Sequence, residues 1–287
     1  MMSVDQALKW ASRQLQKVGV NEPYTEAQLL LSHVLKVSRI ALVRDSERLL
    51  SPFQTIKYKK AVGQRRKRRP AAYILGHKPF MHWHFYVGRG VLIPRPETEM
   101  LVELATAWLS DKPSPLVADI GTGSGAVGLS IAALVPEAVV HAVDISHRAL
   151  AVARRNARML NVSSRVYFHR GDLLAPLQKW QGGIDCITAN LPYLTPEEYS
   201  ALPEELYHEP RRALVAEPDV LSLYRRMLSA AGSMLRPGGL ILLEVGSTQG
   251  QEVERIFREK GFVSTAVLQD LAGHGRVVRG QKRHLKP

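Results

Sequence analysis

The sequence predicts an α/β protein in which a small helical bundle precedes a doubly wound, mostly parallel sheet. Apolar residues recur at helical spacing through the first eighty or so residues, and they alternate with period two just after that. From Pro94 onward, short apolar strands alternate with helices, the pattern of a sheet covered on both faces. With 287 residues and 45% apolar content, the chain can form one large domain or two modest ones.

The first region is predicted to be a bundle of short helices. Gly19 is placed to end the first helix, and two segments resemble capping boxes, Thr25-x-x-Gln28 and Ser51-x-x-Gln54. Pro52 would occupy the first helical position of the later helix, where its missing N–H costs nothing. The apolar residues that define the first helix are Val4, Ala7, Leu8, Ala11, Leu15 and Val18.

A β-hairpin is predicted next. Trp83, Phe85 and Val87 alternate with polar or aromatic residues, and Gly88-Arg89-Gly90 would turn the chain into the segment 91–93. The sequence therefore predicts a helical domain over 1–78, a hairpin linker over 79–94 and an α/β domain over 95–287.

Seven strands are expected in the α/β domain. Each is a short apolar run separated from the next by a helical pattern, and seven such strands fit a doubly wound sheet. The predicted strands are Leu116 to Ile120, Val139 to Val143, Val166 to His169, Ile184 to Ala189, Leu240 to Val245, Val263 to Leu268 and a last one near Arg276 to Arg279.

The formal net charge of +13 is concentrated in the N-terminal third of the chain. Residues 1–94 carry 17 Lys and Arg against five Asp and Glu, whereas the remainder is nearly neutral. The densest part, Arg65-Arg66-Lys67-Arg68-Arg69, lacks interleaved aromatic residues that could stack on bases. Either this charge attracts an acidic protein, RNA or the ribosome by electrostatic docking, or it forms a solvated helical face.

Several classes of site are not expected. Cys186 is the only cysteine, so it cannot form an intrachain disulfide or a thiolate metal cluster, and a buried, inert thiol is predicted. His77, His82 and His84 have no thiolate or carboxylate beside them, so no metal site is predicted there. Without an apolar membrane span or signal peptide, the sequence predicts a soluble cytoplasmic protein.

A glycine-rich loop follows the first strand of the sheet. It runs Gly121-Thr122-Gly123-Ser124-Gly125 before a helix, and glycines there let the backbone approach a ligand closely. Its order is G-x-G-x-G, which differs from the dinucleotide fingerprint. A phosphate-binding loop would require a Lys-Ser/Thr pair after the glycines, and none follows here. Asp119, two residues before Gly121, is expected near the ammonium group of a bound cofactor.

Two further carboxylates mark a nucleoside site. Asp144 follows the second strand, where it can accept hydrogen bonds from both ribose hydroxyls. Asp172 and Leu173 follow the third, where the carboxylate can accept from an adenine amino group and the leucine can pack on the ring. Because ligands of open α/β sheets bind at the carboxyl ends of the strands, these positions together predict nucleoside binding.

The fourth strand ends in Asn190-Leu191-Pro192-Tyr193. The nitrogen of an amide or exocyclic amino group is a poor nucleophile because its lone pair is delocalised, so its methylation requires acceptors that hold both N–H groups. Asn190 offers a side-chain oxygen, and the backbone carbonyl before Pro192 or of Pro192 itself offers a second acceptor. Proline stiffens the loop, and Tyr193 can stack on a planar group. Catalysis would then depend mainly on positioning and electrostatic alignment.

With these residues in place, the chain resembles the bacterial release factor glutamine methyltransferases, the protein-(glutamine-N5) methyltransferase family, over nearly its whole length. The segment Ile93-Pro-Arg-Pro-Glu-Thr-Glu99 is far more specific than the glycine loop, which most methyltransferases of this fold share. The other matching segments are Arg69 to Gly76, Asp119 to Gly125, Asn190 to Tyr193, Glu209 to Leu214 and Asp270 to Gly273.

The resemblance implies a helical N-terminal domain that recognises the substrate, a hairpin and a Rossmann-like class I methyltransferase domain. It also implies methyl transfer from S-adenosylmethionine to the glutamine of the Gly-Gly-Gln motif in class I peptide chain release factors. By it, residues 121–125, Asp144, Asp172 and Asn190 contact the cofactor, and Asn190 to Tyr193 hold the glutamine. Glu97 and Thr98 are expected to wall the substrate site. We expect a monomer that does not require nucleic acid.

The sequence departs from the family pattern at two places. Leu191 stands where the family usually has proline, and residues 215–219 replace a glycine-rich stretch. Two alternatives stay open. One is an amino-methyltransferase that acts on a ribosomal protein glutamine or a nucleic-acid base, although a flipped base usually needs contacts to its neighbours. The other is a non-catalytic adaptor that binds a nucleoside or RNA, for which a degraded glycine loop or Asn190 would be expected.

Overall fold

The computed structural model describes residues 2–284, and the chain divides into two compact units. The helical unit contains the chain as far as His77 together with Pro203–His208. The α/β unit contains Lys78–Leu202 and the chain from Glu209 onward. The domain boundaries predicted from the sequence stay predictions.

The helical unit has a continuous apolar core. Its helices are α1 (Val4–Gln16), α2 (Pro23–Leu35), α3 (Arg39–Arg44), α4 (Pro52–Arg66) and α5 (Ala71–Leu75). The predicted capping box at Ser51 is confirmed, because the Gln54 N–H donates to Ser51 Oγ at 3.2 Å and Gln54 Oε1 accepts from the Ser51 N–H at 2.9 Å. The box expected at Thr25 is wrong, since α2 already begins at Pro23, whose fixed φ suits the first helical position.

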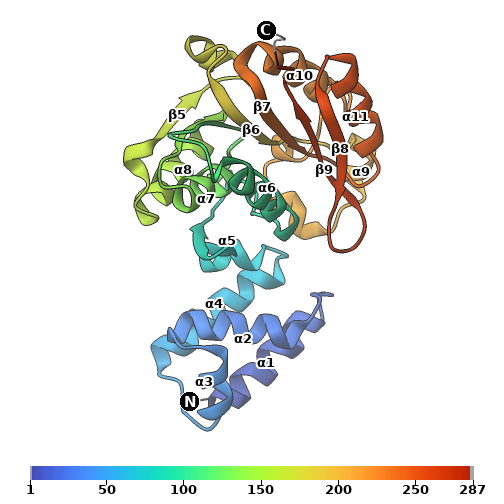
Figure 1. Ribbon diagram of the computed structural model, residues 1–287. Helices are drawn as coiled ribbons and strands as arrows, with labels where there is room; N and C mark the ends of the chain where they lie inside the picture. The colour runs from blue at the N-terminus through green and yellow to red at the C-terminus, as the bar shows by residue number, and fades with distance from the viewer. Residues whose placement is uncertain (1, 285–287) are drawn as a thin grey trace. The chain divides into compact units, whose positions relative to one another are not determined.

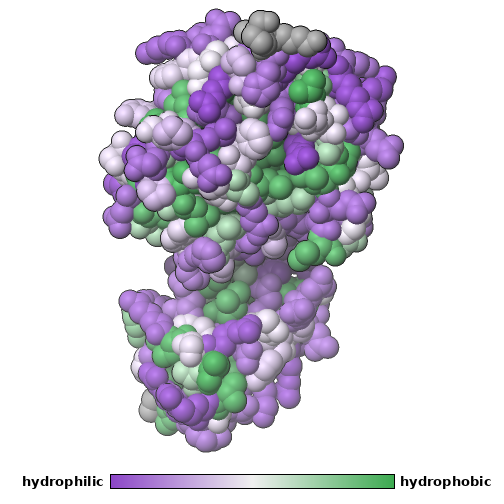
Figure 2. Space-filling view, in the orientation of Figure 1, coloured by the Kyte–Doolittle hydropathy of each residue, from purple (hydrophilic) through white to green (hydrophobic). Residues whose placement is uncertain are grey.

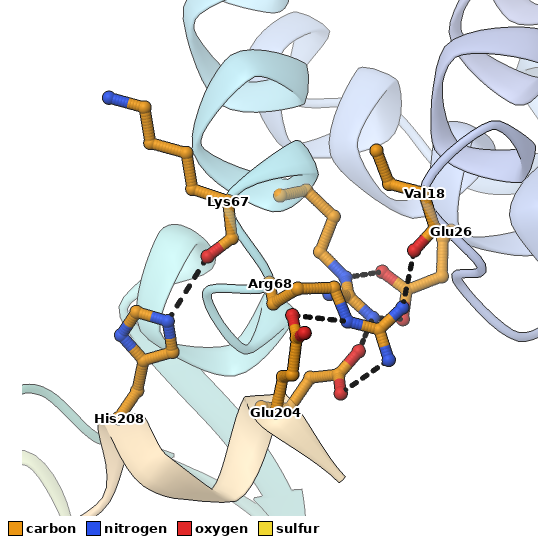
Figure 3. A network of polar contacts seen from close by, with 8 residues as sticks. Val18, Glu26, Lys67, Arg68, Glu204 and His208 are labelled. Atoms are coloured by element: carbon orange, nitrogen blue, oxygen red, sulfur yellow. Dashed lines mark hydrogen bonds and ion pairs between the residues drawn. The ribbon is translucent and has the colours of Figure 1, made fainter.

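A network of polar contacts joins the basic run to glutamates within the helical unit (Figure 3). Arg65 Nε lies 2.9 Å from Glu26 Oε2, and Arg65 Nη2 lies 3.0 Å from Glu205 Oε1. Arg68 Nη2 lies 2.8 Å from Glu205 Oε2, while its Nη1 donates to the Val18 carbonyl at 2.9 Å. Glu205 belongs to the 3-10 helix Glu204–His208, so a distant segment of the chain completes this unit.

These contacts revise the interpretation of the basic run as a docking surface. Arg65 is 4% exposed and Arg68 is half-buried, so both guanidinium groups act inside the unit. Arg66 and Lys67 are the members of the run that are exposed. Charge density in the sequence thus overstated the charge available to a partner.

The predicted hairpin is present, but it turns earlier than expected. Strands β1 (His77–Phe80) and β2 (Trp83–Tyr86) form a two-stranded sheet, so the turn lies at Met81 and His82 rather than at residues 88–90. Met81 adopts a left-handed φ of +50°, a conformation that glycine reaches more easily than a residue with a Cβ. Residues 91–93, expected as a strand, form none.

The predicted seven-stranded α/β fold is confirmed (Figure 1). The strand order is β5-β4-β3-β6-β7-β9-β8, with β9 antiparallel to both neighbours and the other pairings parallel. The strands are β3 (Leu116–Ile120), β4 (Val139–Asp144), β5 (Val166–Arg170), β6 (Ile184–Asn190), β7 (Leu235–Glu244), β8 (Val263–Gln269) and β9 (Gly275–Gln281).

Helices cover both faces of this sheet. The α-helices are α6 (Glu99–Leu109), α7 (Ala126–Leu134), α8 (His147–Met159), α9 (Pro196–Ser200), α10 (Ser222–Met234) and α11 (Gly250–Glu259). Short 3-10 helices span Pro96–Thr98, Ser163–Arg165, Ala175–Trp180 and Arg211–Ala213. Successive strand residues face opposite sides, so α6 and α7 pack with Val117 in one apolar core, while α10 and α11 pack with Ala118 in another (Figure 1).

Candidate active site

A cavity of about 570 Å³ opens at the carboxyl ends of the central strands in the α/β unit. Strand β3 lies between β4 and β6, and the chain crosses to opposite sides of β3 at this point. Such a switch point separates the loops that follow neighbouring strands and leaves a crevice for a ligand. The cavity is in the size range of small-molecule and cofactor sites.

The glycine loop forms one wall of this cavity. Gly121 and Gly123 line it, and both have left-handed φ values, +71° and +57°. Gly125 has a φ of +86°, and a Cβ there would lie 2.6 Å from Leu129 Cδ1 of α7. The loop therefore needs glycine both for its backbone conformation and for close packing against the following helix.

Asp119 lies behind the glycine loop. Its Oδ2 accepts from Thr122 Oγ1 at 2.6 Å and from the Gly128 N–H at 3.0 Å, and its Oδ1 accepts from Thr188 Oγ1 at 3.0 Å. Burial raises the pKa of this carboxyl, although the three hydrogen bonds oppose that effect. Asp119, Thr122, Ser124 and Gly125 are not among the described residues that line the cavity. In this arrangement Asp119 braces the loop against β6 and α7.

Asp144 ends β4 and lines the cavity. Its Oδ2 accepts from the Gly123 N–H at 2.9 Å, and its Oδ1 accepts from the Ser146 N–H at 2.7 Å. Burial raises the pKa of this carboxyl, while these hydrogen bonds and the positive charge of Arg212 lower it. A carboxylate has about four acceptor positions, so Asp144 can still accept from a ligand hydroxyl while it holds the glycine loop.

Asp172 and Leu173 lie on the cavity lining beyond β5. The Asp172 carboxylate pairs with Arg226, and Leu173 has a left-handed φ of +48°, which is uncommon for a residue with a Cβ. Arg212 and Arg226 also line the cavity, and neither was predicted from the sequence. No sequence pattern marked Arg212, and Arg226 lies on an ordinary amphipathic helix, so only the fold places them here.

The segment Asn190 to Tyr193 begins at the carboxyl end of β6. Asn190, Leu191 and Pro192 line the cavity, and Tyr193 is not among the described lining residues. The loop is braced on both sides, because the Tyr193 N–H donates to the Leu214 carbonyl at 3.2 Å and Gln249 Nε2 donates to the Tyr193 carbonyl at 2.8 Å. Burial raises the pKa of the Tyr193 hydroxyl. A rigid loop thus presents the Asn190 amide at the cavity.

Thr98 and Glu97 differ in their contacts and in their burial, although both were expected to wall the substrate site. Asn190 Nδ2 donates to Thr98 Oγ1 at 3.2 Å, and Thr98 is buried. Glu97 is exposed, and neither residue is among the described residues that line the cavity. Glu209 anchors the segment Ile93 to Glu99, which contains Glu97 and Thr98. Its Oε2 accepts from the Ile93 N–H at 2.8 Å, and its Oε1 lies 2.6 Å from Arg95 Nη2.

Metal ligands are not grouped in the part of the chain that the structure describes. Among residues 2–284, no set of three or more His, Cys, Asp or Glu side chains is arranged to hold a metal ion. Within the same residues, no helix has both the length and the apolar character needed to cross a membrane. Burial raises the pKa of the Cys186 thiol, consistent with an inert side chain.

The fold and the glycine-loop cavity define a methyltransferase-type α/β domain. A family model described as a methyltransferase domain matches residues 117–209, and one described as the PrmC N-terminal domain matches residues 6–76. A solved structure of ribosomal protein L11 methylase from Lactobacillus delbrueckii subsp. bulgaricus shares the fold, with a TM-score of 0.50 and 23% identity over 69% of this chain and 84% of that chain.

The relatives identify the family. A release factor glutamine methyltransferase from Moorella thermoacetica is 41% identical over 98% of this chain and 99% of its own length. Another, from Clostridium acetobutylicum, is 37% identical over 96% of this chain and 98% of its own length. The chain belongs to the release factor glutamine methyltransferase family, and the resemblance predicted from the sequence is confirmed.

Proposed function

We propose that this protein transfers a methyl group from S-adenosylmethionine to the side-chain amide nitrogen of the glutamine in the Gly-Gly-Gln motif of class I peptide chain release factors. Family membership supports the reaction class. The observation that carries the proposal is the cavity itself, in which the glycine loop, Asp144 and the Asn190 to Pro192 segment line one space. Cofactor and amide can therefore meet there.

The residues present fit the proposed cofactor. Its adenosine would be held by Asp144 and Asp172, and the glycine loop leaves room that a Cβ would fill. When bound, S-adenosylmethionine supplies an activated methyl group on a sulfonium centre. Asn190 lies on the same lining, where its side-chain oxygen can accept from the amide that receives the methyl group.

The protein's part in catalysis is then to hold a planar amide. Asn190 Oδ1 accepts one N–H, and a backbone carbonyl of the Leu191 to Pro192 segment accepts the other, so the nitrogen faces the cofactor. The bracing of this loop by Leu214 and Gln249 reduces the reorganisation that such alignment would otherwise need. The proton leaves after the nitrogen becomes cationic, so no general base is required beforehand.

A protein substrate is favoured over a nucleic acid by the surface of the helical unit. Arg65 and Arg68 of its basic run are paired internally, and large apolar side chains are exposed in the same unit (Figure 2). Exposed apolar residues fit a protein partner better than a phosphate backbone. They are Ile40, Val43, Leu49, Phe53 and Ile56.

Labelled S-adenosylmethionine tests the proposal directly. The protein is incubated with a class I release factor or with the same factor carrying Gln→Ala in its Gly-Gly-Gln motif. We expect label on the unaltered factor and none on the variant. Equal labelling of both would reject the glutamine assignment. Labelling of ribosomal protein or nucleic acid in place of the factor would support the alternative amino-methyltransferase.

A further inference from the structure

Two walls of the cavity come from separate segments of the chain. One is the glycine loop, and the other is the segment 90–92, which follows the hairpin. Both pass close to helix α8. A Cβ at Gly125 would lie 3.3 Å from Ala153 Cβ, and a Cβ at Gly90 would lie 3.5 Å from Arg148 Cβ. Helix α8 is therefore in a position to fix the spacing of the two walls.

Asn156 on this helix joins the two segments by hydrogen bonds. Its side chain is fully buried, and its Nδ2 donates to the Ser124 carbonyl at 2.8 Å and to the Tyr86 carbonyl at 3.0 Å. Its Oδ1 accepts from the Tyr86 N–H at 2.8 Å. These partners leave one orientation for the amide, because the opposite one would place its oxygen against two carbonyl oxygens. The two donors of this side chain are thus divided between the hairpin and the glycine loop.

The contact with Ser124 controls the conformation of the glycine loop. The C=O and N–H of a trans peptide group are coplanar and point in opposite directions. Holding the Ser124 carbonyl against α8 therefore also sets the direction of the Gly125 N–H, which donates to the Thr122 carbonyl at 2.7 Å. This bond closes a turn that contains Gly123, a residue of the cavity lining. The orientation imposed by Asn156 is transmitted in this way to the cavity.

The contact with Tyr86 anchors the other wall. The Arg155 guanidinium lies over the Tyr86 ring, 3.5 Å from its centroid. Just beyond the segment 90–92, the Ile93 N–H donates to Glu209 Oε2 at 2.8 Å. The cavity-lining segment belongs to no strand, and it is held by side chains before it and after it. It can therefore keep its place at the cavity before a ligand binds.

We propose that Asn156 is a positioning residue for the cofactor, which holds the glycine loop and the segment 90–92 at a fixed spacing before the cofactor binds. The cofactor site itself rests on the proposed function above. Asn156 is not among the described residues that line the cavity, so it acts through Ser124 and Tyr86. A site that is already arranged loses less free energy to ordering when its ligand binds. Asn156 thus contributes to cofactor affinity more than to the methyl-transfer step.

Calorimetric titration with S-adenosylhomocysteine tests this role without methyl transfer. Asn156→Ala should raise the Kd about tenfold, the effect of losing about one hydrogen bond. Its kcat at saturating S-adenosylmethionine should change less than about twofold, because an interaction made equally in the ground state and the transition state affects KM alone. Phe262→Leu is the matched control, since Phe262 is buried beside β8, at the opposite edge of the sheet from β5.

The control separates positioning from general stability. Both variants should lower the free energy of unfolding, which urea denaturation measures, but Phe262→Leu should leave the Kd unchanged. An unchanged Kd in Asn156→Ala, or equal increases in the two variants, would overturn the inference.

A second measurement follows the loop itself. Asn156→Ser is a milder variant that keeps a hydroxyl. Without ligand, its Gly123 and Gly125 amide NMR signals should be broadened by exchange between loop conformations, and S-adenosylhomocysteine should sharpen them. Signals as sharp as those of the wild type would refute the positioning role. If the signals broaden but the wild type does not bind S-adenosylhomocysteine, the proposed function fails while the link between Asn156 and the loop stands.

Discussion

Two regions of the molecule are rich in charged and polar residues, and they use them in opposite ways. In the helical unit, Arg65 and Arg68 are paired with Glu26 and Glu205 at 2.8–3.0 Å, so their charges are compensated inside the unit. At the strand ends of the α/β unit, polar groups are braced by neighbours and yet keep acceptor positions at the cavity, as Asp144 does. The density of charge in a sequence therefore says less about a binding site than the acceptor positions that the fold leaves at a cavity.

The sharpest test of this contrast is at Asn190, which should matter for rate and little for folding. Asn190→Ala should lower turnover by about two to three orders of magnitude, comparable to the loss of one oriented hydrogen-bonding group in an active site. Its unfolding transition should stay close to that of the wild type, because the side chain lies on the cavity rather than in a core. Single-turnover methyl transfer and chemical denaturation measure the two effects. Near-normal turnover would remove Asn190 from the mechanism.

Arg65 should show the opposite behaviour. Arg65→Ala should lower the free energy of unfolding by about 3 kcal/mol, because it leaves the partly buried Glu26 without its counter-charge and Glu205 with Arg68 alone. The exposed neighbour Arg66 is the control, and Arg66→Ala should change stability by about 0.5 kcal/mol or less. Urea denaturation of both variants gives the comparison. Equal effects at the two positions would restore the interpretation of the run as a solvent-facing charge patch.

Asp144 lies between these extremes, because it holds the loop and faces the cavity at once. Asp144→Asn removes one of the acceptor oxygens and the charge, so the cofactor Kd should rise about ten- to a hundredfold, as expected for lost hydrogen bonds to a charged group. Calorimetric titration with S-adenosylmethionine measures this, with the exposed Asp111→Asn as control. An unchanged affinity would mean that Asp144 serves only to brace Gly123.

Much of the α/β fold could be predicted because its signals are local. The apolar runs at residues 116–120 and 263–268 differ from the observed strands by no more than one residue, since each is bounded by residues that favour turns. Strand β7 begins at Leu235, five residues earlier than predicted, because Pro237 and two glycines hid an extended segment. A Gly-Arg-Gly signal likewise misplaced the hairpin, whose turn uses Met81 instead.

The residues of the candidate site were harder to predict than the strands, and their roles stay predictions. Asp144 and Asn190 could be named because they follow strands at a switch point. Arg226 could not, since an arginine on an amphipathic helix gives no sign in the sequence that it pairs with Asp172. The same limit explains why Glu205 was missed, because no pattern links it to arginines more than a hundred residues earlier.

A substitution at Glu205 should have the smallest effect of these variants, and it tests specifically the charge pairing in the helical unit. Burial alone would raise the pKa of its carboxyl, but hydrogen bonds and the positive charges of Arg65 and Arg68 lower it below the ordinary 4.5. A carboxyl whose pKa is depressed by folding stabilises the folded state above its unfolded pKa, and this contribution is lost as the pH falls through the folded value. Glu205→Gln should therefore be less stable than the wild type at pH 7, and the difference should shrink below about pH 4.5. Thermal unfolding across this range measures it, and the exposed Glu137→Gln should show no such convergence. A difference that is constant with pH would mean that Glu205 contributes through packing, not through its charge.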